Sequence, residues 1–256
     1  MTKQLKMKVV DWWQPDNEEN FYNNYIVKKL KDKYDILYSD KPDFLIYSCF
    51  GYKHANYDCV RIFYTGENVR PDFNLADYAI SFDYTICEDR HLRAPLPFFT
   101  QNKSKELQDV LNTRLHFAKN KTKFCGFVAS NGYLTQKRNK FFEALCGYKH
   151  VDSGGRYKNN IGGNVLCKMS WLQSYKFNIC FENSSYPGYL TEKLFDAFIS
   201  GCIPIYWGDT SLNCTKDNNI SQANNFTFNN TSTQNKVMNN SINNINNDDG
   251  GGGKYL

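Results

Sequence analysis

The sequence lacks several patterns that would indicate a metal enzyme or a membrane protein. It contains no D-x-D, no two histidines four residues apart and, among its nine cysteines, no C-x-x-C pair. No run approaches the roughly 18 apolar residues of a membrane span. The N-terminal lysines are not followed by the apolar segment of a signal peptide. We therefore expect no built-in metal site, reduced thiols and a cytoplasmic protein.

An excess of charge of one sign is also lacking. The net charge is +5 over 256 residues, and the basic residues are dispersed. Proteins that bind nucleic acid usually show a basic patch or stripe, so we expect no nucleic-acid partner. A mildly basic chain suits an anionic small ligand. Aromatic residues make up 16% of the chain, which is typical of a folded enzyme that stacks sugars or bases on rings.

Short apolar runs alternate with segments of helical spacing, which predicts an α/β fold with parallel sheets. In the first half, strands are expected at 7–12, 44–47, 61–64 and 77–82, with a helix over 22–30. In the second half, we expect strands at 124–128, 177–181 and 203–206, and helices at 136–145 and 191–200. A polar connector over 95–123 then separates two α/β domains, residues 1–120 and 121–213.

The composition changes abruptly after Asn213. Residues 217–247 are dominated by asparagine, and glycines fill positions 250–253. Such a segment cannot bury enough apolar surface to offset the entropy lost on ordering. We predict that residues 214–256 form a disordered tail and that the second domain is incomplete.

Two basic side chains are predicted at the carboxyl ends of parallel strands, where open α/β sheets collect ligands. Lys193 lies in the first turn of one predicted helix and Arg138 in the first turn of another. Backbone N–H groups at a helix start and a planar guanidinium both suit phosphate oxygens. The alternative is that both are solvated surface charges, as most lysines and arginines are.

Carboxylates and polar side chains accompany these cations. Glu192 could stabilise an oxocarbenium-like charge, although a first-turn acid also complements the helix dipole. Glu67 follows Gly66 in a turn and could accept a proton from a hydroxyl group, or could be a turn residue only. Asn183 and Tyr189 could contact sugar hydroxyls, and could equally be a turn former and a core aromatic.

The motifs FNICFENS at 177–184, GYLTEKL at 188–194 and IPIYWG at 203–208 together resemble the donor-binding motif of a known family. That family is the α-1,3/4-fucosyltransferases, glycosyltransferase family 10. The motifs DWW at 11–13, FYTGEN at 63–68 and FVASN at 127–131 are similar to its bacterial members. The similarity runs in order from about residue 8 to residue 213.

The resemblance implies two Rossmann-like domains that face each other across a cleft, the GT-B fold, with the second domain truncated here. It implies GDP-fucose as donor and inverting transfer to a GlcNAc or glucose hydroxyl, in an α-1,3 or α-1,4 linkage. The acceptor would be an oligosaccharide such as a lipopolysaccharide O-antigen or a Lewis-type glycan. Peripheral association with the inner membrane is left open.

The resemblance also implies roles for individual residues. Glu67 would be the general base and Glu192 would lie beside the fucose, Arg138 and Lys193 would bind the diphosphate, and Asn183 and Tyr189 would line the nucleotide-sugar pocket. Members need no bound metal, although Mn²⁺ or Mg²⁺ stimulates some of them. Two alternatives remain: a truncated remnant that binds GDP without turnover, and a transferase of the same fold that uses another nucleotide sugar.

Overall fold

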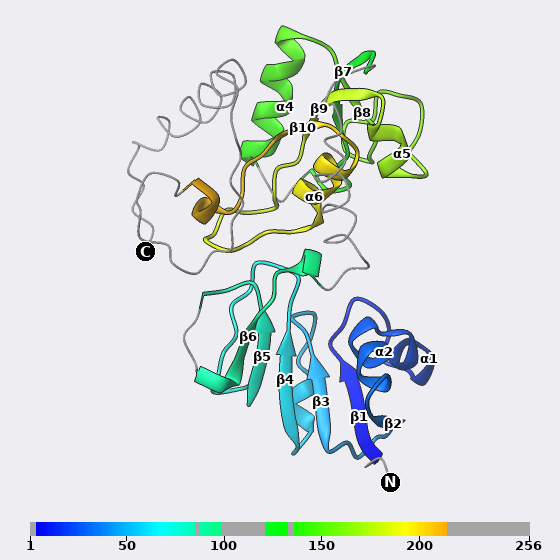
Figure 1. Ribbon diagram of the computed structural model, residues 1–256, viewed down its shortest axis with the longest axis vertical. Coiled ribbons are helices and arrows are strands. Elements are labelled where there is room, and N and C mark those ends of the chain that lie inside the picture. Colours follow the sequence, from blue (N-terminus) through cyan, green and yellow to red (C-terminus); the bar gives the residue numbers. More distant parts are fainter. Residues whose placement is uncertain (1–3, 85–87, 99–120, 133–135, 214–256) are drawn as a thin grey trace. The chain divides into compact units, whose positions relative to one another are not determined.

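The computed structural model describes residues 4–84, 88–98, 121–132 and 136–213. Within these residues the chain forms two parallel β-sheets flanked by helices (Figure 1). Residues Met1–Asn213 form one compact unit, and the fold described below belongs to that unit. The predicted tail, the boundary predicted at residue 120 and most of the predicted connector lie outside the described residues.

The first sheet contains the four strands that were predicted in the first half of the chain and two that were not predicted, at 35–38 and 91–93. Its order is β2-β1-β3-β4-β5-β6, and every neighbouring pair is parallel. The strands are β1 (Gln4–Val10), β2 (Asp35–Tyr38), β3 (Phe44–Tyr47), β4 (Val60–Tyr64), β5 (Tyr78–Ser81) and β6 (His91–Arg93). Short 3₁₀ helices lie at Lys53–Asn56, Glu88–Arg90 and Leu96–Phe98. Parallel pairing confirms the fold class predicted from the alternating pattern.

Two helices, α1 (Glu18–Asn23) and α2 (Tyr25–Lys31), connect β1 to β2, where the sequence predicted one helix over 22–30. The division occurs at Asn24, whose backbone is extended (φ −62°, ψ 131°). Its side-chain oxygen accepts hydrogen bonds from the backbone N–H groups of Ile26 and Val27, at 2.9 and 3.4 Å. The prediction of one helix was wrong because apolar spacing does not register a cap that restarts the helix.

The second sheet has the order β10-β9-β7-β8, again with every pair parallel. Its strands are β7 (Lys123–Phe127), β8 (Val151–Ser153), β9 (Tyr175–Ile179) and β10 (Ile203–Ile205). The helices are α4 (Gln136–Tyr148), α5 (Lys168–Leu172) and α6 (Glu192–Ile199), followed by a 3₁₀ turn at Thr210–Asn213. Pro204 lies in β10, which is at one end of this strand order, where the N–H that proline lacks is not needed for pairing.

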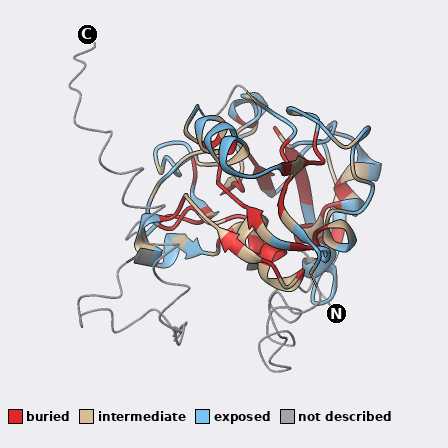
Figure 2. Cartoon of the chain, turned by 90° about the horizontal axis from the view of Figure 1, so that it is seen from above, coloured by how far each residue is buried: buried red, intermediate tan, exposed pale blue. Residues whose placement is uncertain are grey.

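The six-stranded sheet is buried on both faces. Ile46 and Tyr64 pack with residues of α1 and α2, whereas Leu45 and Phe63 pack in a second cluster. Successive side chains of a strand point to opposite faces, so a parallel sheet covered on both sides needs apolar residues at consecutive positions. Figure 2 shows the buried residues concentrated on strands and the exposed residues on outer loops and helices.

No helix in the described part of the chain combines the length and the apolar character needed to cross a membrane. Within the same residues, no group of three or more His, Cys, Asp or Glu side chains is placed to hold a metal ion. The cysteines that the structure describes are free thiols.

Candidate functional site

The predicted site residues follow the carboxyl ends of parallel strands. Glu67 comes shortly after β4, and Asn183 comes shortly after β9. Arg138 lies in the first turn of α4, after β7, and Glu192 and Lys193 open α6. These positions agree with the sequence pattern, since ligands of open α/β sheets bind beyond the carboxyl ends of the strands.

Arg138 is a buried cation with a relative exposure of only 4%. Its Nη1 donates to Oδ1 of Asn183 at 3.4 Å, and its Nη2 donates to the carbonyl oxygen of Asn131. Among the described residues no carboxylate pairs with the guanidinium, and its Nε has no hydrogen-bond partner. Burial lowers the pKa of Arg138, while Tyr157 and Glu182 act in the opposite direction. A buried charge without a counter-charge is costly, so this guanidinium is suited to receive an anion.

Lys193 has an internal counter-charge that the sequence analysis missed. Its Nζ donates to Oε2 of Glu182 at 2.8 Å and to Oγ1 of Thr191 at 3.0 Å. Glu182 is fully buried, and 20% of the Lys193 side chain remains exposed. From the sequence, Lys193 was interpreted either as a cation that binds an anionic ligand or as a solvated surface charge. Neither interpretation included Glu182, which stabilises the ammonium at the start of α6.

Three carboxylates act on the same ammonium and on one phenol. Burial lowers the pKa of Lys193, but Glu182, Glu192 and Glu67 outweigh it, so its pKa stands above the usual value. The same carboxylates raise the pKa of Tyr189 further, after burial as the main cause. The Glu67 turn and the start of α6 are thus electrostatically coupled. Nearby, Nδ2 of Asn68 donates to Oγ of Ser184 at 2.7 Å.

Tyr189 is a core aromatic in this structure. It is 1% exposed, and its ring lies edge-on to Phe82 with centroids 5.1 Å apart. The preceding Gly188 has φ +83°, and a Cβ there would meet the carbonyl oxygen of Phe82 at 2.7 Å. Of the two roles considered for Tyr189, core packing is therefore the one that its contacts support directly.

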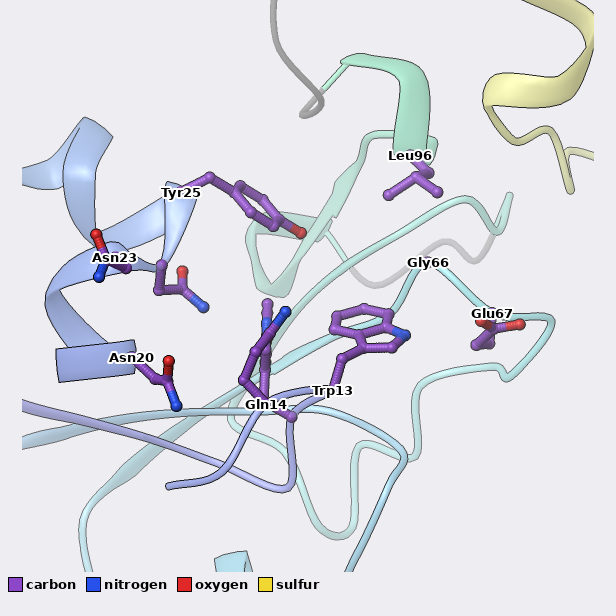
Figure 3. A pocket seen from close by; sticks show the side chains of 10 residues that line it. Trp13, Gln14, Asn20, Asn23, Tyr25, Gly66, Glu67 and Leu96 are labelled. Carbon is purple, nitrogen blue, oxygen red and sulfur yellow. The ribbon is translucent and has the colours of Figure 1, made fainter. Parts of the chain in front are cut away.

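A pocket of about 360 Å³ adjoins Glu67 (Figure 3). Aromatic rings, side-chain amides and one carboxylate line it: Trp12, Trp13, Gln14, Asn20, Asn23, Asn24, Tyr25, Gly66, Glu67 and Leu96. Figure 3 shows the indole of Trp13 between Gln14 and the turn that carries Glu67. An apolar wall with a few polar groups is typical of small-molecule sites. In the sequence, Trp12 and Trp13 stand out only as part of the DWW motif, and no pattern there predicts the pocket.

Asp11 fixes the two tryptophans where the chain leaves β1. It has φ +53°, which is uncommon for a residue other than glycine. Its carboxylate accepts the backbone N–H groups of Lys53 and His54, both at 3.0 Å, and contacts Nδ1 of His54 at 2.8 Å. These bonds hold the unusual backbone conformation that turns Trp12 and Trp13 toward the pocket.

Comparison with known proteins identifies the lineage of this fold and site. One family model, described as the α-(1,3)-fucosyltransferase FucT N-terminal domain, matches residues 7–100. A second, described as glycosyltransferase family 10 (fucosyltransferase) C-term, matches residues 118–249. The chain belongs to glycosyltransferase family 10. The match to the glycosyltransferase family 10 model extends past Asn213, the residue after which the composition changes.

Two relatives in family 10 differ in the linkage that their names give. The α-(1,3)-fucosyltransferase FucT of Helicobacter pylori is 36% identical over 249 residues, which cover 81% of this chain and 51% of the relative. An α-(1,4)-fucosyltransferase of Arabidopsis thaliana is 26% identical over 237 residues, which cover 82% of this chain and 55% of the relative. The chain thus spans about half the length of these relatives.

Solved family 10 structures share the fold. A crystal structure of an α1,3-fucosyltransferase with GDP-fucose superposes with a TM-score of 0.65 at 33% identity, covering 82% of this chain and 70% of that one. A crystal structure of an α1,3-fucosyltransferase with GDP gives a TM-score of 0.67 at 32% identity, covering 96% and 81%. These likenesses support the α/β fold with parallel sheets.

Proposed function

We propose that this family 10 chain carries the sites with which a fucosyltransferase moves fucose from GDP-fucose to a GlcNAc or glucose hydroxyl of a glycan. The linkage would be α-1,3 or α-1,4, and the anomeric configuration would invert. The proposal includes the GT-B arrangement, a cytoplasmic location and an acceptor such as lipopolysaccharide O-antigen. Support comes from the family, from the structures with GDP-fucose and GDP, and from the chemistry of the site.

The buried guanidinium of Arg138 carries the proposal. It has hydrogen-bonding capacity to spare at Nε and no carboxylate partner among the described residues. A planar fork of donors matches phosphate oxygens in geometry and charge. In our proposal Arg138 and Lys193 bind the diphosphate and offset the charge that develops on GDP as it leaves. Asn183, which contacts Arg138, faces the nucleotide sugar.

Glu67 and Glu192 would act on the acceptor hydroxyl and on the fucose ring, respectively. Glu67 takes the proton from the acceptor hydroxyl as that oxygen attacks the anomeric carbon and the bond to GDP breaks. Glu192 offsets positive charge on the fucose ring in the oxocarbenium-like transition state. The electrostatic effect of both carboxylates on Lys193 is consistent with one shared site.

The pocket beside Glu67 would hold the acceptor sugar. A tryptophan face packs against the apolar face of a pyranose ring, and amide groups exchange hydrogen bonds with its hydroxyls. Trp13 supplies the face, and Asn20, Asn23 and Gln14 supply amides. An acceptor placed there lies next to Glu67, as the base role requires.

Incubation of the purified chain with GDP-fucose and N-acetyllactosamine tests the proposal. We expect GDP release together with a fucosylated product. GDP binding by calorimetry without turnover at any enzyme concentration would favour the truncated remnant. Faster turnover of GDP-mannose or UDP-galactose would favour a transferase for another nucleotide sugar, and absence of GDP binding would overturn the proposal. Parallel assays with a chelator and with added Mn²⁺ test the expectation that no bound metal is required.

A further inference from the structure

Glu182 is the most deeply buried charged group of the site and has no role so far. It follows β9, is fully buried, and its backbone N–H donates to the carbonyl oxygen of Trp207 at 2.8 Å. Burying a carboxylate this way is costly unless it is paired and hydrogen-bonded. The hydrogen bonds and the ion pair that offset the cost of burying this carboxylate come from residues at the start of α6.

Both carboxylate oxygens of Glu182 are engaged. Oε1 accepts the backbone N–H of Thr191 at 2.8 Å. Oε2 accepts the hydroxyl of Thr191 at 2.6 Å and the ammonium of Lys193 at 2.8 Å. Thr191 is the N-cap of α6, yet its side chain makes no capping bond within the helix. Its hydroxyl instead donates to Glu182 and accepts from Lys193, which closes a triangle of hydrogen bonds.

The surrounding chain leaves room for this carboxylate and for little else. A Cβ at Gly208 would lie 2.4 Å from Cγ of Glu182 and 2.6 Å from the hydroxyl oxygen of Tyr206. Both distances are far inside van der Waals contact. Gly208 therefore permits β10 and the loop after it to close over Glu182, and any larger residue would displace the carboxylate.

The triangle determines where the ammonium of Lys193 points. Two of its three N–H donors are directed to Glu182 and Thr191, and part of the side chain remains exposed. A lysine on a flexible stem would otherwise sample many rotamers, at a cost of up to about 2 kcal/mol of side-chain entropy on ordering. With two donors fixed inside, the third is held for a ligand at the start of α6.

We infer that Glu182 is a positioning residue for the donor: its hydrogen bonds to Thr191 and Lys193 orient the ammonium of Lys193 toward the diphosphate. This inference rests on the proposed function, in which Lys193 meets the diphosphate. Glu182 itself is fully buried, and both of its carboxylate oxygens are engaged by Thr191 and Lys193. Its role is to fix the Lys193 side chain before the nucleotide binds, so that binding does not have to order that side chain.

The test is the affinity of GDP for the full chain, measured by calorimetry. In E182Q one of the two oxygens becomes an NH₂ group, which cannot accept a hydrogen bond. Since both oxygens face donors of Thr191 or Lys193, the substitution removes part of this hydrogen-bonding network together with the negative charge beside Lys193. We expect the Kd for GDP to rise about tenfold, the scale of one lost charge-assisted contact. The matched control is E143Q, which breaks the exposed ion pair between Glu143 on α4 and Lys158 and should leave the Kd unchanged.

Two further readouts separate positioning from a structural role. If Glu182 acts through Lys193, E182Q will weaken GDP binding little further in a K193M background, whereas independent effects would add. In E182Q, burial of Lys193 is opposed by fewer carboxylates, so its pKa should fall. As pH is raised, GDP affinity of E182Q should then begin to decline at a lower pH than that of the wild type.

The results that would refute the role of Glu182 differ from those that would refute the proposed function. If the wild type binds GDP and E182Q binds it equally well, this inference is wrong and the proposed function stands. If E182Q does not fold, T191V decides, because it removes only the hydroxyl of the triangle. A Kd at least threefold higher for T191V supports the inference, and an unchanged Kd overturns it. A wild type that binds no GDP refutes the proposed function itself.

Discussion

At the scale of single residues, Glu67 combines a side chain open to the pocket with a backbone that is fixed without it. Oγ1 of Thr65 accepts the backbone N–H of Glu67 at 2.9 Å and donates to its carbonyl oxygen at 3.2 Å. The turn therefore does not depend on the carboxylate. Glu67→Gln should fold normally and lower turnover by about 10²-fold or more, while GDP affinity stays nearly constant. Steady-state kinetics and calorimetry check both parts. Equal losses of turnover and GDP affinity would rule out the base role.

Replacing Arg138 is predicted to lower GDP affinity without lowering the stability of the chain. Its guanidinium is buried without a carboxylate partner, so an apolar side chain of similar length removes an uncompensated charge. Arg138→Met should keep or raise the free energy of unfolding of the ligand-free chain. GDP affinity should fall by about 1–3 kcal/mol, the cost of a lost charge-assisted contact.

Denaturant unfolding without ligand and calorimetry with GDP measure the two effects of Arg138→Met. Lys176→Met is the control, since Lys176 is an exposed cation in the same sheet, and it should change neither quantity. A large loss of stability with intact GDP binding would show that Arg138 is a structural residue.

At the scale of elements, the end of α6 depends on a glycine in the left-handed region. Gly201 has φ +67°, and its N–H donates to the carbonyl oxygen of Phe198 at 2.8 Å. A Cβ there would meet nothing closer than the Lys121 side chain at 3.5 Å, so the penalty is conformational and not steric. Gly201→Ala should lower the free energy of unfolding by about 1–2 kcal/mol.

Gly147 provides the matched control for Gly201. It lies inside α4, where a Cβ would meet nothing within 4 Å. Gly147→Ala should therefore raise the free energy of unfolding, by up to about 1 kcal/mol. Urea unfolding of both variants checks the contrast. Equal effects of the two substitutions would show that the backbone at Gly201 is not strained by an alanine.

The four-stranded sheet contains a pH-dependent contact between three strands. Asp152 on β8 accepts Oη–H of Tyr175 on β9 at 2.7 Å and Nζ–H of Lys123 on β7 at 3.1 Å. Burial raises the pKa of Asp152, but these bonds and His150 outweigh it, so its pKa lies below the usual 3.8. A depressed pKa means that the stabilisation is present above that value and is lost as pH falls.

Asp152→Asn tests this contact. The variant should be less stable than the wild type by about 1–2 kcal/mol at pH 7. The difference should shrink progressively as pH falls below the usual carboxyl pKa of 3.8, because the wild-type carboxyl then takes up a proton as well. Urea unfolding at a series of pH values measures it. A difference that does not change with pH over the whole acid range in which the chain stays folded would show that the charge of Asp152 does not stabilise the sheet.

Sequence patterns predicted some elements well and missed others for identifiable reasons. The predicted strand at 44–47 coincides with β3, and the predicted start of the helix at 136 coincides with α4. The short elements β6, β8 and α5 were not predicted, because three to five residues carry too little periodicity. They depend on neighbouring strands and helices for their stability.

At the scale of the whole molecule, the sequence placed the site residues at strand ends but not their partners. The pairing of Lys193 with Glu182, the burial of Tyr189 against Phe82 and the bond from Asn68 to Ser184 depend on distances in the folded chain. Motif spacing contains no such distances. The pocket at Trp13 was missed for the same reason, since its walls come from α1, α2 and the Glu67 turn.

The compactness of residues Met1–Asn213 leads to a prediction about cooperativity. Both sheets belong to this unit, and contacts such as Asn68 with Ser184 connect segments that follow one sheet and the other. A ligand that binds the native state alone stabilises it by RT ln(1 + [L]/Kd), about 2.7 kcal/mol at 100 times Kd. If the unit unfolds as a whole, GDP should slow amide exchange about 100-fold in both β3 and β9.

Hydrogen exchange with and without GDP tests this cooperativity, read out on the slowest amides of each strand. In our proposal GDP contacts Arg138 and Lys193, which adjoin the four-stranded sheet. Slower exchange in β3 would therefore report energy transmitted through the fold and not a local contact. Arg138→Met at the same GDP concentration should lose most of the slowing in both strands. Slowing confined to β9 would show instead that the two sheets unfold independently, and that donor binding stabilises only one of them.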